Sequence, residues 1–94
     1  MPDTELNLDT TLSIPEQVMS RLVDEETVLI DLSTGIYFGL DGVGQRIWES
    51  IADGCSIREI AAVIVADYEV DLAKARSDVF AFVEELLKRG LLTR

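Results

Sequence analysis

Few side chains in this 94-residue sequence could do chemistry. There is no histidine, which removes the commonest general base and the commonest metal ligand. The one cysteine, Cys55, has no second thiol with which to form a disulfide and no histidine to activate it. Carboxylates at Glu25–Glu26, Asp31 and Glu84–Glu85 fall in polar turns or faces, where solvated surface charge explains them. No cluster has metal-ligand spacing and no glycine run suits a phosphate, so we expect no catalytic residue, no metal and no cofactor.

The charge balance limits the classes of partner that the protein can bind. Eight Lys and Arg against 18 Asp and Glu give a formal net charge of -10, which disfavours nucleic acids and anionic membranes and favours a partner with basic patches. No apolar run approaches the ~18–20 residues of a membrane span, and the N-terminus lacks the features of a signal peptide. We expect a cytoplasmic protein with a flexible polar tail at residues 1–9 and a single domain at 10–94.

The first half of the sequence has the two-residue period of strands. A short β-prone stretch at Thr10–Ile14 stops at Pro15, and extended character resumes at Val18–Val23. The clearest hairpin joins Thr27–Leu32 to Ile36–Leu40 through the three-residue loop Ser33-Thr34-Gly35, with Gly35 in the left-handed conformation. If Leu32 pairs with Ile36, one face of the hairpin is apolar, whereas the other face is mixed. The apolar face would hold Val28, Ile30, Leu32, Ile36, Phe38 and Leu40, and the mixed face Leu29, Asp31, Tyr37 and Gly39.

From Asp41 onward the period is that of helices. Asp41 can cap a helix that runs to about Asp53, and Ser56 with Glu59 forms a capping box before a helix that starts at Ile57. Asp71 can cap a third helix, which continues to about Arg89 before Gly90. We therefore predict an α+β fold: a three-stranded antiparallel sheet with its N-terminal hairpin, followed by a winged-helix-like bundle of three helices.

The third helix carries more apolar surface than one packed side requires. One stripe contains Leu72, Ala75, Val79, Phe82 and Leu86, and beside it runs a second set of Arg76, Phe80, Val83 and Leu87. Both stripes could be buried by the hairpin and the other helices. The alternative is that the second set lines a groove next to Ile36–Leu40, a candidate edge strand without a lysine or proline to block pairing. Such a groove suits a peptide that adds as an extra strand.

The chain resembles the PqqD family, also described as RiPP recognition elements, which bind the leaders of ribosomally made and then modified peptides (RiPPs). Three segments carry the resemblance: "ETVLIDLSTGIYFGLDGVGQRIWESI" (26–51), "SIREIAAVIVADYEVD" (56–71) and "DVFAFVEELLKRGLL" (78–92). The resemblance implies that a leader peptide adds beside the last strand, against the third helix. Carried to this sequence, the peptide-binding residues are Ile36, Tyr37, Phe38, Gly39 and Leu40 on the strand and Arg76, Phe80, Val83 and Leu87 on the helix.

The resemblance also suggests a pathway. The chain is most similar to stand-alone members from lasso-peptide clusters, where a leader peptidase and a cyclase act on the delivered precursor. The alternative within the family is a chaperone that serves a radical SAM enzyme in another RiPP pathway. Outside the family, a winged-helix DNA-binding regulator also fits the helix pattern, although the acidic charge disfavours DNA binding. A purely structural adaptor is a third alternative.

Overall fold

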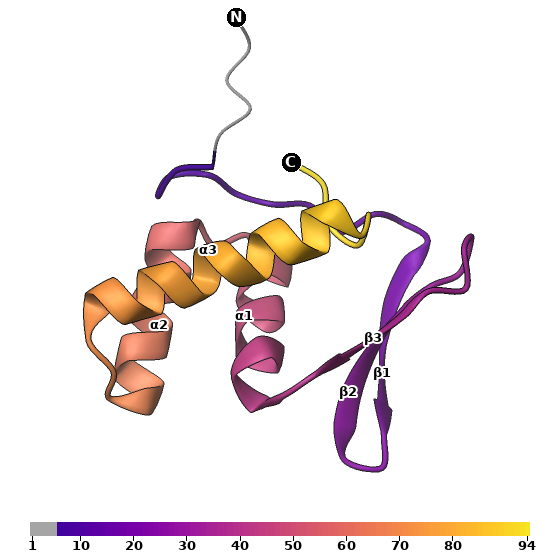
Figure 1. Cartoon of the computed structure of the whole chain (residues 1–94), viewed down its shortest axis with the longest axis horizontal. Coiled ribbons are helices and arrows are strands. Elements are labelled where there is room, and N and C mark those ends of the chain that lie inside the picture. The colour runs from indigo at the N-terminus through magenta and orange to yellow at the C-terminus, as the bar shows by residue number, and fades with distance from the viewer. Residues whose placement is uncertain (1–5) are drawn as a thin grey trace, which may run out of the picture.

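The computed structural model describes residues 6–94 and has the expected α+β architecture (Figure 1). Residues 1–5 of the predicted tail lie outside this range. Three antiparallel strands come first and three helices follow, with the sheet beside the helices rather than between them. The elements are β1 (Val18–Val23), β2 (Glu26–Asp31), β3 (Tyr37–Leu40), α1 (Gly42–Ala52), α2 (Ile57–Tyr68) and α3 (Leu72–Lys88).

The strands follow one another in the sheet as β1, β2 and β3, so β1 and β3 form its edges. β1 and β2 are joined by Asp24 and Glu25, both with positive φ (52° and 69°), which is the backbone of a two-residue type I′ turn. β2 pairs with β3 so that Leu29 lies opposite Phe38 and Thr27 opposite Leu40. Leu29, Leu40 and Val18 are buried and supply the sheet's part of the core.

The predicted register of the second hairpin is wrong by one residue. Asp31, rather than Leu32, pairs with Ile36, and its amide donates to the Ile36 carbonyl at 2.9 Å. The shift turns Leu29 and Asp31 toward the helices, and it leaves Leu32 65% exposed. The cause is the Asp31 carboxylate, which accepts hydrogen bonds from the Ser33 amide and hydroxyl at 2.9 and 2.8 Å. This capped loop contains four residues instead of the predicted three.

The helices begin where the sequence predicts. Asp41, Ser56 and Asp71 each accept a hydrogen bond from a backbone amide of the first turn, and the Ser56–Glu59 capping box is complete. Each helix buries one stripe against the others and the sheet. The largest fully buried side chains are Leu29, Ile47, Ile51, Ile57, Ile60, Val79, Val83, Leu86, Leu91 and Leu92.

The segment before β1 lies against the bundle. The Leu8 and Thr10 carbonyls accept hydrogen bonds from the first amides of α2, and Ser13 pairs with Thr93 near the C-terminus. Asp9 also forms an exposed ion pair with Arg58. The division into a flexible tail and a domain stays a prediction, but these contacts tie residues 8 and 9 to the domain.

Among residues 6–94, no helix is long and apolar enough to cross a membrane.

Candidate peptide-binding edge

Among residues 6–94, no strand pairs with the outer edge of β3. Because paired positions alternate along an antiparallel ladder, the hydrogen bond between Asp31 and Ile36 directs the backbone groups of Phe38 and Leu40 toward β2. The N–H and C=O groups of Tyr37 and Gly39 then point away from β2. Tyr37 and Gly39 therefore offer two donors and two acceptors to an additional strand.

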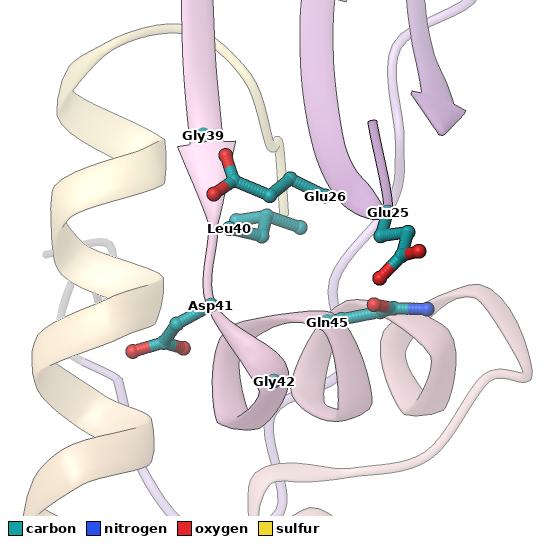
Figure 2. A pocket seen from close by; sticks show the side chains of 7 residues that line it. All are labelled: Glu25, Glu26, Gly39, Leu40, Asp41, Gly42 and Gln45. Atoms are coloured by element: carbon teal, nitrogen blue, oxygen red, sulfur yellow. The ribbon is translucent and has the colours of Figure 1, made fainter. Parts of the chain in front are cut away.

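One flank of α3 lies next to this edge. Phe82, Glu85 and Arg89 recur at helical spacing. We call them the β3-facing flank, because Phe82 meets the end of β3 at Gly44 and Arg89 lies over Phe38. At its C-terminal end the Arg89 guanidinium lies 4.8 Å from the centre of the Phe38 ring, where it also pairs with Glu85 at 2.6 Å. Figure 2 shows β3 between α3, drawn in pale orange, and β2. A strand added to β3 would therefore have the β3-facing flank beside it.

The other end of this flank is packed closely. A Cβ atom on Gly44 would lie 3.1 Å from the Phe82 ring, 3.2 Å from the Asp41 carboxylate and 3.6 Å from Leu40. Gly44 thus allows α1, α3 and the end of β3 to meet. The half-buried ring of Phe82 thus lies where α3 meets the end of β3.

A pocket of about 490 Å³ opens at the end of β3 (Figure 2). Three carboxylates, from Glu25, Glu26 and Asp41, contribute to its lining, and no basic side chain does. The Asp41 carboxylate is engaged as the cap of α1, accepting from the Gly44 amide at 2.7 Å. The remaining lining residues are Gly39, Leu40, Gly42 and Gln45.

The five predicted strand residues lie together along this edge, with alternating orientations. Tyr37 is 68% exposed, and Ile36 and Gly39 are also exposed. Phe38 is half-buried beneath Arg89, whereas Leu40 is buried in the core. The backbone of the strand is thus accessible, while the side chains of Phe38 and Leu40 mainly hold it against the helices.

The structure places the predicted helix residues elsewhere. Val83 is 0% exposed and belongs to the core, so in this structure its side chain does not line an open groove. Phe80 is half-buried, but at 3.6 residues per turn it lies about 160° around α3 from Phe82, on the far side of the buried stripe. Arg76 and Leu87 share the side of Phe80. Arg76, Phe80 and Leu87 are therefore separated from the β3 edge by the core stripe.

Sequence reasoning missed Phe82 and Arg89 as residues beside the edge. The sequence pattern places Phe82 in the core stripe and Arg89 at the end of the helix. The sequence contains one signal that could have found Phe82: Gly44 in the first turn of α1, where a missing side chain indicates close approach by another element. Nothing local in the sequence indicates the contact between Arg89 and Phe38, 51 positions apart.

Asp31 is also misplaced by the sequence prediction, because it is a buried turn cap (3% exposed) rather than a surface charge. The hydrogen bonds from Ser33 hold the pKa of its carboxyl below the ordinary value of 3.8 and outweigh the opposing effect of burial. Within residues 6–94 we find no group of three or more Cys, Asp or Glu that could hold a metal ion. The candidate site therefore consists of the open backbone edge of β3, with the apolar Phe82 and the charged Arg89 beside it.

Solved structures similar to this one include two complexes with leader peptides. The structure "TbiB1 in Complex with the TbiA(beta) Leader Peptide" is 41% identical in sequence, with a TM-score of 0.79 over 85% of this chain and 93% of that chain. The structure "Lasso peptide synthetase B1 complexed with the leader peptide" is 25% identical, with a TM-score of 0.84 over 90% and 100% of the two chains.

A third structure supports the fold alone, at 21% identity. It is the PqqD truncation of Methylobacterium extorquens PqqCD, a stand-alone RiPP recognition element, with a TM-score of 0.79 over 97% of both chains. No curated protein matches the chain. The family model for PqqD, coenzyme PQQ synthesis protein D, matches residues 26–92, which include the whole edge and all three helices. On this match and on the 41% identity to TbiB1, the chain belongs to the PqqD family.

Proposed function

We propose that this protein binds the leader segment of a ribosomally made precursor peptide, which adds as a fourth strand beside β3. The observation that carries the proposal is the open edge at Tyr37 and Gly39, next to the β3-facing flank of α3. The leader pairs with the backbone of residues 36–40, and its alternate side chains lie against Phe82 and Arg89. The relative TbiB1, in complex with a leader peptide, supports this assignment.

The binding energy must come from side chains as well as from the backbone. Tyr37 and Gly39 supply up to four hydrogen bonds, each worth about 0.5–1.5 kcal/mol net. Association costs at least ~4 kcal/mol in lost freedom. A micromolar affinity, about -8 kcal/mol, then requires two or three buried apolar side chains at about 1.5–3 kcal/mol each. The backbone edge therefore sets direction and register, and side-chain anchors supply much of the affinity.

The protein acts in the cytoplasm as a binding module without catalytic activity of its own. It delivers the bound precursor to a leader peptidase and to a cyclase in lasso-peptide biosynthesis. The likeness to a lasso peptide synthetase B1 supports this pathway over one with a radical SAM enzyme. Neither nucleic acid nor membrane is a partner, because on α3 the basic Lys74 and Arg89 are already paired with Asp78 and Glu85 in a strongly acidic protein.

A titration with the TbiA(beta) leader peptide tests the proposal. Fluorescence anisotropy of the labelled peptide should give a Kd in the micromolar range or below, about -8 kcal/mol or better. A scrambled peptide of the same composition controls for charge attraction and should bind much more weakly. Equal binding of the leader and the scrambled peptide, or of neither, would contradict leader recognition.

A further inference from the structure

Gly39 occupies an edge strand at a position where nothing in the fold requires glycine. Its φ is not positive, unlike that of Gly35, Gly54 and Gly90. A Cβ atom added there would have no heavy atom within 4 Å. Glycine within a strand is less favourable than alanine, because it loses more conformational freedom on folding. Neither backbone conformation nor internal packing explains why a residue with a side chain is absent from this position.

A glycine in a strand often marks a place where a ligand approaches the backbone closely. Gly39 has three features that fit such a ligand. Its backbone groups belong to the open edge, its own surface is exposed, and it lines the 490 Å³ pocket. In Figure 2 the Glu26 side chain extends toward Gly39 from the neighbouring strand, with no side chain of Gly39 to block it. The open space beside Gly39, which we call the gap, is therefore continuous with the outer edge of β3, where a peptide would add.

The geometry of a sheet determines which peptide side chain reaches this gap. Residues directly opposite each other on neighbouring strands project to the same face. Tyr37 and Gly39 project away from the helices, since the core-facing residues of β3 are Phe38 and Leu40. The peptide residue opposite Gly39 thus projects to the outer face, where it lies beside the exposed Tyr37 and the half-buried Val28.

We propose that Gly39 is a specificity-determining residue that admits a large side chain of the leader, at the leader position opposite it. This inference rests on the proposed strand addition and deepens it. The leader is then recognised on both faces: toward α3 by the residues opposite Phe38 and Leu40, and on the outer face by the residue that covers Gly39. An aromatic or long aliphatic side chain over an edge glycine recovers the packing that the strand lacks.

Two substitutions in the same row of the sheet test the inference. Gly39→Val places a side chain at this position, whereas Arg21→Val introduces the same residue on the same face at the opposite edge, across Val28 from Gly39. Gly39→Val should fold at least as stably as the wild type, because valine favours strands. It should weaken binding of the TbiA(beta) leader at least tenfold, and Arg21→Val should leave the affinity within about twofold.

An alanine scan of the same leader, measured with both proteins, identifies the opposing residue. With the wild-type protein, truncation of one large leader residue to alanine should weaken binding of the leader at least tenfold. With Gly39→Val, the same truncation should weaken binding only slightly or should restore it. Circular dichroism and a thermal melt establish that Gly39→Val is folded. Wild-type affinity for Gly39→Val, or additive effects at every leader position, would overturn the inference while leaving leader binding intact. Failure of the wild type to bind the leader would instead refute the proposed function.

Discussion

Gly44 permits the close approach of α1, α3 and the end of β3. The effect of Gly44→Ala on the free energy of unfolding can therefore be worked out from opposing contributions. Alanine raises helix propensity by up to about 1 kcal/mol. Against this, the new methyl group would lie 3.1 Å from the Phe82 ring and 3.2 Å from the Asp41 carboxylate. Overpacking of this kind costs about 1–3 kcal/mol, and disturbing the Asp41 cap removes part of a further ~1 kcal/mol. Gly44→Ala should therefore lower the free energy of unfolding by about 1–2 kcal/mol.

Urea denaturation followed by fluorescence of Trp48, the single tryptophan and a buried residue of α1, measures the effect. The matched control is the same substitution in a Phe82→Leu background, where the ring that the methyl group meets is gone. There Gly44→Ala should cost nothing or stabilise by up to about 1 kcal/mol. If Gly44→Ala instead stabilised the otherwise wild-type protein by about 1 kcal/mol, this result would refute the tight contact between α1 and α3.

Three further substitutions test the turns and the core. Glu25→Gly should stabilise the protein by about 1 kcal/mol in the same urea assay, because Glu25 has φ 69° and left-handed backbone penalises side chains; the control Glu26→Gly should destabilise it. The lowered pKa of Asp31 stabilises the fold above pH 3.8, and this contribution should be lost as the pH falls through the folded-state pKa. Asp31→Asn should therefore reduce the loss of stability at acidic pH. An unchanged loss of stability would contradict the role of the Asp31 carboxylate as the cap of the loop. Val83→Asp should unfold the domain by circular dichroism, since burial of an unpaired carboxylate costs several kcal/mol; a folded variant would contradict the core position of Val83.

The sequence predicts the features of the fold that depend on local chemistry. Asp41, Ser56 and Asp71 begin their helices as expected because a capping side chain and its amide lie within three residues of each other. The order of strands and helices follows from the change of period at Asp41. These are short-range properties, and any fold that this chain adopts must accommodate them.

The register of the second hairpin was not predictable from hydrophobic alternation. Val28, Ile30 and Leu32 form as regular an apolar row as the buried positions do. The row that faces the core contains Thr27, Leu29 and Asp31, because the Asp31 side chain stabilises a four-residue loop. A single side-chain cap thus reverses the faces of the strand.

The helix wall of the site was not predictable for a different reason. Apolar residues flank the buried stripe of α3 on both sides, with Phe82 on one side and Phe80 on the other. Helical periodicity identifies the stripe but not the flank that lies next to β3. The contacts of Phe82 at Gly44 and of Arg89 with Phe38 decide this, and both join residues far apart in sequence.

Amide hydrogen exchange with and without the TbiA(beta) leader, resolved by residue with NMR, tests strand addition at β3 most directly. The amides of Tyr37 and Gly39 should exchange markedly more slowly when the leader is bound, because they point to the open edge and gain partners. Those of Ser20 and Leu22 point outward from the opposite edge, since the Leu32 amide bonds to the Gln17 carbonyl and paired positions alternate along β1. Their exchange should not change. Slowing at Ser20 and Leu22 but not at Tyr37 and Gly39, in a sample saturated with leader, would contradict the account.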